Sequence, residues 1–485
     1  MFNNELKKYL GNSFNASREE DVFELDKPKE ECGVFGIYNK ENMDSALLTY
    51  YALYALQHRG QESAGIAVNG ERGLLYHKDM GLVPEIFNQD IFERLKGKNA
   101  VGHVRYSASG ENLRENAQPM VIKYKDGQLA IAYNGSLVNT LQIRERLEEE
   151  GIIFQSTIDP EVILNLISRY RVSSNGIEES IIKMMGEVKG AYAMVILTPN
   201  KLIGIRDPHG IRPLCIGLLG DSYIFASETC ALDAVGAKYV RDVKPGEIAV
   251  VEEEGLKSIQ TETPSQSRLC IFEHIYFARP DSYIDGVSVY RARVEAGRRL
   301  AMEHPVDADL VFGVPDSGLT PALGYSMQSG IPYGLGLIKN RYVGRTFIQP
   351  NCSQRENGVR IKLNALKEAI YGKRVVMIDD SIVRGTTSKR LVQILRKAGV
   401  KEVHMRVSSP PYRYPCYFGM DISDKAELIA TKHTIAEIKD IIGVDTLGFL
   451  SIEGLLKTPV GAKCGFCTAC FTGDYPMEIS NSKEK

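Results

Sequence analysis

The segment 375–388 contains several neighbouring residues whose side chains could take part in binding or catalysis. Its four apolar residues at 375–378 predict a strand buried on both faces of a parallel sheet. Two acids, Asp379 and Asp380, follow, and a loop rich in Gly, Thr and Ser then leads into 389–396, which has the apolar spacing of a helix. Ligands of such sheets bind beyond the carboxyl ends of the strands. We therefore expect a binding site at this loop.

The groups of this loop suit a sugar that carries phosphates. The N–H groups of 384–387 and the hydroxyls of Thr386, Thr387 and Ser388 can surround a phosphate at a helix N-terminus, where the helix dipole favours an anion. The two carboxylates would accept hydrogen bonds from ribose hydroxyls or bind Mg²⁺. A strand that ends in acids is also common in α/β domains without this role. A Walker-type NTPase is the nearest alternative, but the chain contains no Gly-Lys-Ser or Gly-Lys-Thr.

The whole segment closely resembles the phosphoribosylpyrophosphate (PRPP) motif of type I phosphoribosyltransferases. The resemblance implies that Asp379 and Asp380 hold the ribose hydroxyls and help to place Mg²⁺. It also implies that the following loop holds the 5′-phosphate of PRPP. The residues of that loop are Val383, Arg384, Gly385, Thr386, Thr387 and Ser388.

Two other segments would complete this site. The turn 314–318, Val-Pro-Asp-Ser-Gly, follows an apolar strand, and Ser317 could bind Mg²⁺ or pyrophosphate. The basic segment 339–346 is expected to be a mobile loop that closes over pyrophosphate. Its contacts to PRPP would come from Lys339, Arg341 and Arg345. The alternative for this segment is a solvated charged loop.

Length and composition restrict the class of protein. At 485 residues the chain is long enough for two or three domains, and 44% hydrophobic with 25% charged residues is ordinary for a soluble protein. A net charge of −2 gives no electrostatic sign of nucleic acid or an anionic membrane as partner. No apolar run approaches the roughly 18 residues of a membrane span. We expect a cytoplasmic protein, whose nine cysteines serve as free thiols, metal ligands or catalytic groups.

The chain divides into two halves of different pattern. In the first half, short apolar strands and helical patterns recur, which suggests sheets covered by helices. The expected strands are 33–38, 129–133, 191–197 and 223–226, and the expected helices are 46–56, 141–149, 161–169 and 177–185. Residues 252–268 are polar enough to be a linker. Beyond them strands at 310–314, 375–378 and 403–407 alternate with helices, which predicts a parallel sheet.

Cys32 precedes the first expected strand, in the segment Glu-Glu-Cys-Gly-Val-Phe-Gly-Ile. A lone cysteine beside a strand is usually a small buried hydrophobe. The segment 32–37, however, resembles the mature N-terminus of the N-terminal-nucleophile glutamine amidotransferases. That resemblance implies that residues 1–31 are a propeptide, whose removal frees the α-amine of Cys32. Such an amine, with an unperturbed pKa of about 8, can act as the general base for its own thiol. We therefore predict that the full chain is an inactive precursor for glutamine hydrolysis.

Three further segments match the same family in order. They are 57–65, 101–107 and 133–136. By this resemblance Arg105 would bind the α-carboxylate of glutamine through a planar two-point contact. Asn134 and the N–H of Gly135 would form an oxyanion hole. We expect a structural role for 57–65.

The chain departs from the family pattern at two places near the glutamine site. Family members usually carry Thr where this chain has Ala108, so one hydroxyl is missing. They usually read Ser-Asp-Thr-Glu where this chain has Thr-Ile-Asp-Pro-Glu at 157–161. Asp159 is the residue that we expect to bind the α-amine of glutamine.

The cysteines of the second half form another constellation. Cys464, Cys467 and Cys470 lie three apart, while Cys270 and Cys416 lie in distant segments. Spacing alone leaves a structural zinc and an iron–sulfur cluster equally open. One branch of the glutamine PRPP amidotransferases combines a propeptide with a [4Fe–4S] cluster, and resemblance to it favours the cluster. Carried over, its ligands are Cys270, Cys416, Cys464 and Cys467, one structural cluster per subunit, with Cys470 free.

Resemblance to this family covers residues 32 to about 478 and implies the fold class. The first domain would be an N-terminal-nucleophile glutaminase domain, with two antiparallel sheets between helix layers. The second would be a type I phosphoribosyltransferase domain, with a parallel sheet flanked by helices. The implied boundaries are a propeptide at 1–31, a glutaminase domain at 32–260, a phosphoribosyltransferase domain at 261–463 and a cysteine-containing tail at 464–485.

The expected function is transfer of the amide nitrogen of glutamine to PRPP, which gives 5-phosphoribosylamine at the first committed step of purine synthesis. The implied cofactors are one Mg²⁺ and one [4Fe–4S] cluster per subunit. The implied partners are glutamine, PRPP, inhibitory purine nucleotides and three further copies of the chain in a homotetramer. Two alternatives stay open: a PRPP-binding regulatory module without turnover, and another amidotransferase with an N-terminal cysteine.

Overall fold

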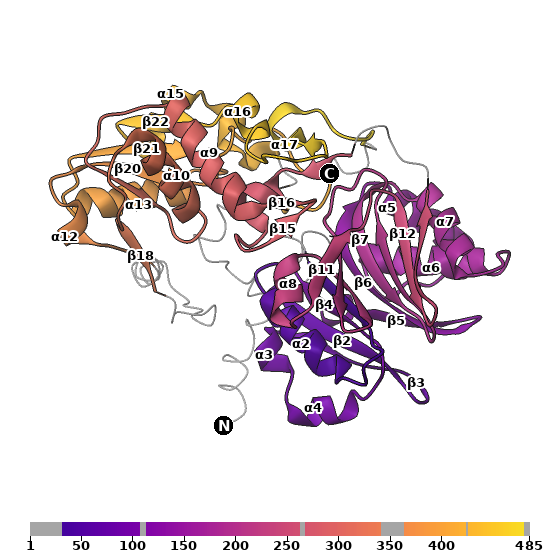
Figure 1. Cartoon of the computed structure of the whole chain (residues 1–485). Coiled ribbons are helices and arrows are strands. Elements are labelled where there is room, and N and C mark those ends of the chain that lie inside the picture. The colour runs from indigo at the N-terminus through magenta and orange to yellow at the C-terminus, as the bar shows by residue number, and fades with distance from the viewer. Residues whose placement is uncertain (1–31, 107–112, 262–266, 341–362, 423–424, 480–485) are drawn as a thin grey trace, which may run out of the picture.

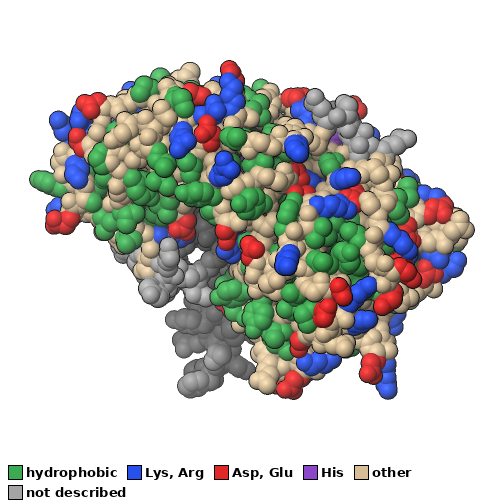
Figure 2. Space-filling view, in the orientation of Figure 1, with side chains coloured by type: hydrophobic (Ala, Val, Ile, Leu, Met, Phe, Trp, Pro, Cys, Tyr) green, Lys and Arg blue, Asp and Glu red, His purple; other side chains and the backbone are tan. Residues whose placement is uncertain are grey.

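The chain folds into two halves that lie side by side, seen in the computed structural model in Figure 1. The structure describes residues 32–106, 113–261, 267–340, 363–422 and 425–479. Lys, Arg, Asp and Glu side chains are interspersed over the face in Figure 2. No helix among the described residues is both long and apolar enough to cross a membrane.

The first half contains two antiparallel sheets. The seven-stranded sheet has the order β11 (Lys238–Asp242), β9 (Cys215–Leu219), β10 (Ser222–Ala226), β1 (Gly33–Tyr38), β4 (Ala100–Arg105), β2 (Ser63–Gly70) and β3 (Gly73–Met80). The six-stranded sheet has the order β13 (Gly255–Gln260), β12 (Glu247–Glu252), β8 (Leu202–Arg206), β7 (Gly190–Leu197), β6 (Gly127–Leu137) and β5 (Met120–Tyr124).

These sheets pack face to face between two layers of helices. In β1, Val34 points toward the other sheet and Phe35 toward the helices, and both are fully buried. Because both faces of the strand are covered, it is apolar throughout and does not alternate with polar residues. The seven-stranded sheet is covered by α2 (Ser45–Ala55), α3 (Val83–Ile86), α4 (Gln89–Arg94) and α8 (Thr229–Ala234). The six-stranded sheet is covered by α5 (Thr140–Glu149), α6 (Asp159–Arg171) and α7 (Ile177–Glu187).

The segment 252–268 is not a linker throughout its length, because β13 lies within it. Val251 pairs with Leu256 across a hairpin turn, and β13 becomes the edge strand of the six-stranded sheet. Lys257, Ser258 and Gln260 are partly or fully exposed, as befits a strand with one neighbour. Its polarity therefore reflects an edge position.

The second half is built on a parallel sheet of the order β17 (Leu310–Gly313), β20 (Arg374–Asp379), β21 (Glu402–Val407) and β22 (Thr446–Phe449). In β20, Val376 packs toward one helix layer and Met377 toward the other. The first layer contains α9 (Val289–Glu303), α10 (Leu319–Ser329) and α16 (Ile452–Leu456), and the second contains α13 (Thr386–Lys397), α14 (Ile429–Lys432) and α15 (Ile435–Ile442). The expected combination of antiparallel and parallel sheets is confirmed.

Short elements complete the described chain. The strand pairs are β14 (Leu269–Cys270) with β23 (Phe466–Cys467), β15 (Tyr283–Ile284) with β16 (Val287–Ser288), and β18 (Leu337–Lys339) with β19 (Leu363–Ala365). The short helices are η1 (Arg114–Asn116), the π-helix η2 (Glu273–Phe277), α12 (Lys367–Ile370), η3 (Lys425–Glu427) and α17 (Ala469–Thr472). The parallel pair β14–β23 brings the end of the chain back to the start of the second half.

Candidate functional site

Cys32 lies at the start of β1, beside the end of β4. The antiparallel register pairs Gly33 with Val104, so the residues that flank this pair, Cys32 and Arg105, are neighbours. The Cys32 side chain is buried, and its Sγ lies 3.7 Å from the carbonyl oxygen of Tyr106. A thiol and a guanidinium therefore share one end of the seven-stranded sheet.

Arg105 is held by a close approach of the loop before β2. Its side chain is only 2% exposed, and its Nη1 lies 3.8 Å from Oε2 of Glu62. The Glu62 N–H donates to the Arg105 carbonyl. A Cβ at Gly60 would lie 2.5 Å from the Arg105 nitrogen, so only glycine fits there. A guanidinium fixed in this way offers the planar pair of donors that binds a carboxylate.

Asn134 and Gly135 lie in β6, where the sheet leaves polar groups without protein partners. Neither side-chain atom of Asn134 has a hydrogen-bond partner among the described residues, although the residue is fully buried. Such atoms are rare and point to a ligand. Gly135 pairs with Tyr192, whose N–H and C=O both bond Asp207 instead. The N–H of Gly135 therefore faces away from β7. Its φ of +146°, and the 2.0 Å separation between a Cβ there and the Ala191 carbonyl, require glycine.

Asp159 is the first residue of α6 and is buried. Its Oδ2 accepts hydrogen bonds from the Leu137 N–H at 2.8 Å and the Tyr133 hydroxyl at 3.3 Å. Its Oδ1 accepts from the Thr140 hydroxyl at 2.5 Å. This carboxylate ties α6 to the end of β6, next to the two oxyanion-hole candidates. Its role in binding the α-amine of glutamine stays a prediction, and Ala108 lies outside the described residues.

The segment 57–65 contains a buried ion-pair node between the two halves. Arg59 donates through Nε to Glu228 and through Nη2 to Glu273. Glu228 also accepts from His58 at 2.7 Å and from the Ser282 hydroxyl at 2.6 Å. The guanidinium of Arg59 holds the pKa of Glu228 well below its usual range despite burial. The position of this node supports the structural role expected for the segment.

In the second half, the two acids lie at the carboxyl end of β20. Asp379 and Asp380 are at most 1% exposed. The hydroxyl of Ser317 donates to Oδ2 of Asp380. Two of the three predicted Mg²⁺ ligands are therefore in direct contact. A Cβ at Gly318 would lie 2.3 Å from the carbonyl of Ile378, which shows how closely the 314–318 turn approaches the strand end.

The loop after these acids leads into the N-terminus of α13. Gly385 precedes the helix with φ of +80°, and Thr387 and Ser388 are buried in its first turn. Arg384 forms an ion pair with Glu427. The first turn of α13 lies at the positive end of the helix dipole, where backbone N–H groups point out of the helix, which is the geometry that binds a phosphate.

Of the three basic residues expected over pyrophosphate, Lys339 is described. Its Nζ lies 2.9 Å from Oδ2 of Asp316, and both side chains are about half exposed. The pair links β18 to the turn that carries Ser317. Arg341 and Arg345 lie outside the described residues.

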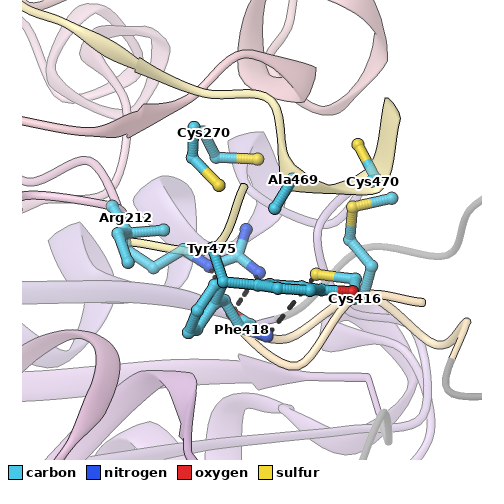
Figure 3. Close-up of a pocket in the computed structure, with 10 residues that line it drawn as sticks. Arg212, Cys270, Cys416, Phe418, Ala469, Cys470 and Tyr475 are labelled. Atoms are coloured by element: carbon cyan, nitrogen blue, oxygen red, sulfur yellow. Dashed lines mark hydrogen bonds between the residues drawn. The ribbon is translucent and has the colours of Figure 1, made fainter. Parts of the chain in front are cut away.

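Four cysteines line one pocket near the end of the chain (Figure 3): Cys270, Cys416, Cys467 and Cys470. Arg212, Phe418 and Tyr475 are among the other residues that line it. Burial raises the pKa of the Cys467 thiol to about 12 and raises that of Cys470 well above its ordinary value. As placed, no three His, Cys, Asp or Glu side chains in the described ranges could hold a single metal ion.

This set differs from the sequence assignment at one position. Cys464 does not line the pocket and packs instead with Leu269 and Ile284. The charge that raises its pKa most, after burial, is Asp285. Cys470, expected to be free, lines the pocket because α17 turns the chain back after Cys467. Both Cys464–Cys467 and Cys467–Cys470 have the same spacing, so the sequence pattern could not separate them.

Sequence reasoning also missed residues that act between elements. Glu62 approaches Arg105, Arg212 lines the cysteine pocket, and Glu228 and Glu273 hold Arg59. Glu62 lies in the family segment 57–65 but had no assigned role, whereas Arg212, Glu228 and Glu273 are single charged residues without a motif. Their only sequence signal is a charge inside an apolar stretch, as for Glu273 between Phe272 and Ile275.

Comparison with known proteins shows the family of the chain. A family model described as glutamine amidotransferase domain matches residues 103–234. An amidophosphoribosyltransferase of Archaeoglobus fulgidus is 50% identical over 450 residues, covering 92% of this chain and 98% of the relative. That of Bacillus subtilis is 51% identical over 456 residues, covering 93% and 95%.

Two solved structures are also similar. Glutamine PRPP amidotransferase from B. subtilis, complexed with ADP and GMP, has a TM-score of 0.87 at 50% identity, over 93% of this chain and 98% of that chain. A structure described as the allosteric regulatory enzyme of purine biosynthesis has a TM-score of 0.88 at 50% identity, over 93% and 97%.

The fold and the two sites define a glutamine amidotransferase joined to a phosphoribosyltransferase sheet. With half of its residues identical over more than nine-tenths of its length, the chain belongs to the amidophosphoribosyltransferase family. It is an enzyme whose reaction is the first step of purine biosynthesis. The expected fold and function are thereby confirmed over the alternatives of a regulatory module and a different amidotransferase.

Proposed function

We propose that Cys32 is the nucleophile that takes the amide nitrogen from glutamine. The Cys32 thiolate attacks the side-chain amide carbon, and the oxygen of the tetrahedral intermediate accepts hydrogen bonds from Asn134 and the Gly135 N–H. Collapse of the intermediate expels NH₃ and leaves a glutamyl thioester, which water hydrolyses to glutamate and free thiol. The unpartnered, buried amide of Asn134 is the observation that carries this proposal.

Substrate orientation in this half would come from Arg105 and Asp159. The buried guanidinium of Arg105 suits the α-carboxylate of glutamine, and Asp159 suits its α-amine. The general base would be the α-amine of Cys32 after removal of residues 1–31. Because an amide nitrogen cannot accept the thiol proton, the uncleaved chain would lack this base.

The second half would present PRPP to the ammonia. Asp379 and Asp380 would accept hydrogen bonds from the ribose hydroxyls and, with Ser317, bind the Mg²⁺ that accompanies the pyrophosphate. The loop 383–388 would hold the 5′-phosphate at the N-terminus of α13. Lys339, Arg341 and Arg345 would neutralise the leaving pyrophosphate as ammonia displaces it from C1, giving 5-phosphoribosylamine. The protein's task there is positioning and exclusion of water.

The cysteine pocket suits a [4Fe–4S] cluster that supplies structural cross-links when bound. Four thiols line the pocket, yet no three of them are close enough together, as placed, for one metal ion. Four thiolates on one zinc would lie within about 4 Å of one another, since each bond is about 2.3 Å. A cluster binds each thiolate to a different iron and so spaces them more widely. Cys270, Cys416, Cys467 and Cys470 would hold it.

We also propose the remaining family features for this chain. They are inhibition by purine nucleotides, for which the ADP and GMP of the similar B. subtilis structure are the support, and a homotetramer. A cytoplasmic location remains a prediction.

One anaerobic preparation tests the nucleophile. Glutaminase activity with and without PRPP is measured for the wild type, for Cys32→Ala and for Cys215→Ala, a buried cysteine of the same sheet used as matched control. We expect Cys32→Ala alone to lose glutaminase while keeping synthesis of phosphoribosylamine from added ammonia. Retained glutaminase in Cys32→Ala would refute the assignment, and N-terminal sequencing of active enzyme that begins at Met1 would refute the processing step.

A further inference from the structure

The strand that carries the oxyanion-hole candidates, β6, loses one of its two neighbours just before it reaches them, while β7 stays paired. The pairing of β5 with β6 ends at Met120 and Ile131. On the edge of β6 that faces away from β7, two side chains bind the Tyr133 backbone. Its N–H donates to Oε1 of Gln118 at 2.9 Å, and its C=O accepts from Nε2 of His103 at 2.9 Å.

Both side chains reach this backbone from other parts of the fold. His103 lies in β4 of the opposite sheet, two residues before Arg105, so both side chains point to the same face of that strand. Gln118 lies between η1 and β5, and the carbonyl of the neighbouring Ala117 accepts a hydrogen bond from Lys78. The two sheets are therefore connected at Tyr133, immediately before the oxyanion-hole candidates.

The environment makes these two hydrogen bonds rigid. His103 is fully buried and Gln118 is 3% exposed, so water does not compete for the Tyr133 peptide groups. Burial lowers the pKa of His103 to about 3, so the ring is neutral. A neutral ring that donates to a carbonyl from Nε2 carries its proton there, and Nδ1 has no partner among the described residues.

We propose that His103 and Gln118 are positioning residues that fix the oxyanion hole by holding the N–H and the C=O of Tyr133 along one edge of β6. The proposal rests on the assignment of Asn134 and Gly135 as the oxyanion hole. In a strand, the backbone groups of alternate residues face the same edge, so the Gly135 N–H faces the edge that these side chains hold. Because β4 also carries Arg105, the same strand sets the position of the substrate carboxylate and of the oxyanion donors.

The test compares loss of each hydrogen bond with its conservative replacement. His103→Leu and Gln118→Met remove the donor and the acceptor at similar volume, and His103→Gln keeps an N–H donor. His404→Gln, at a buried strand histidine of the other half, is the matched control. For each processed enzyme, the measurements are glutaminase kcat, the inhibition constant of glutamate, and ammonia-dependent synthesis.

We expect His103→Leu and Gln118→Met to lower glutaminase kcat about 10- to 100-fold, because a misplaced donor loses most of its transition-state contact. Binding of glutamate and ammonia-dependent synthesis should change less than about twofold, and His103→Gln should recover most of kcat. Nitrogen NMR of the histidine rings should show one ring, missing in His103→Gln, that keeps an Nε2 proton and does not titrate between pH 5 and 9.

Wild-type kcat in both removal variants would overturn the proposal, as would a fall in kcat matched by equal losses in glutamate binding and ammonia-dependent synthesis. If His103→Leu does not fold, Gln118→Met and His103→Gln decide the matter in the same assays. Failure of the nucleophile assignment is seen separately, as glutaminase in Cys32→Ala or as no glutamyl adduct on Cys32 in acid-quenched wild type.

Discussion

Nη2 of Arg59 lies 2.5 Å from Oε2 of Glu273, and neither side chain is more than 1% exposed. This buried ion pair joins the loop before β2, next to the proposed glutamine site, to η2, which follows Cys270. The two halves of the enzyme are thus held by charges that water does not screen.

Breaking this pair should destabilise the protein strongly. Glu273→Gln leaves Arg59 and Arg212 buried with less compensating charge, and we expect a loss of about 3–5 kcal/mol in the free energy of unfolding. Urea denaturation, followed in both halves of the protein, measures this loss in the free energy of unfolding. Glu453→Gln, which breaks an exposed pair with Lys457, should cost below about 1 kcal/mol. Equal effects of the two variants would contradict the prediction.

Asp242 gives the stability a pH dependence. Burial and then Asp285 raise its pKa in the folded protein to about 6, above the unfolded value. The folded state therefore binds a proton that the unfolded state has lost, so this residue's contribution to stability decreases as pH rises from about 4 to about 6. Asp242→Asn should raise the melting temperature at pH 8, by the equivalent of ~1–2 kcal/mol, and leave it nearly unchanged at pH 4. An increase that is the same at both pH values would count against this.

Gly135→Ala should reduce glutaminase activity more strongly than it reduces the stability of the fold. The new Cβ would lie 2.0 Å from the Ala191 carbonyl, so the strand must shift at the proposed oxyanion donor. We expect glutaminase kcat to fall at least about 100-fold. Gly151→Ala is the control: its φ is also positive, at +87°, but nothing lies near the added methyl. Full activity in Gly135→Ala would contradict the assigned role.

Iron content distinguishes the two candidate ligand sets. Cys470→Ser should lose most of the iron and acid-labile sulfide of anaerobically purified enzyme, while Cys464→Ser keeps them, because only Cys470 lines the pocket. Iron and sulfide are determined together with the melting temperature. Loss of iron in Cys464→Ser but not in Cys470→Ser would show that Cys464 is the ligand. Zinc in place of iron would contradict the proposed cluster.

Asp380→Asn should affect the PRPP site alone. It keeps the size of the side chain but removes the charge that would bind ribose hydroxyls or Mg²⁺, so we expect the KM for PRPP to rise at least tenfold, about 1.4 kcal/mol. Glutaminase without PRPP should stay at its wild-type level. Asp309→Asn, just before β17 at the opposite end of the parallel strands, should leave the KM unchanged.

Much of the fold follows from local patterns. The expected strand 33–38 coincides with β1, and the expected helix 177–185 lies within α7. Both have strong apolar patterns with covered faces. β13 was missed because an edge strand with one exposed face is as polar as a linker, and its identity depends on pairing with β12.

The sequence by itself determined the family, the two chemistries and most candidate residues, because motifs are local and their spacing is fixed by the chain. Tertiary structure decided what depends on distance between segments remote in sequence. It brought Cys470 rather than Cys464 to the pocket, made Arg59 a buried link between the halves, and placed His103 and Gln118 on the backbone of one residue, Tyr133. Burial and the direction of a hydrogen bond are properties of packed elements, and no spacing along the chain encodes them.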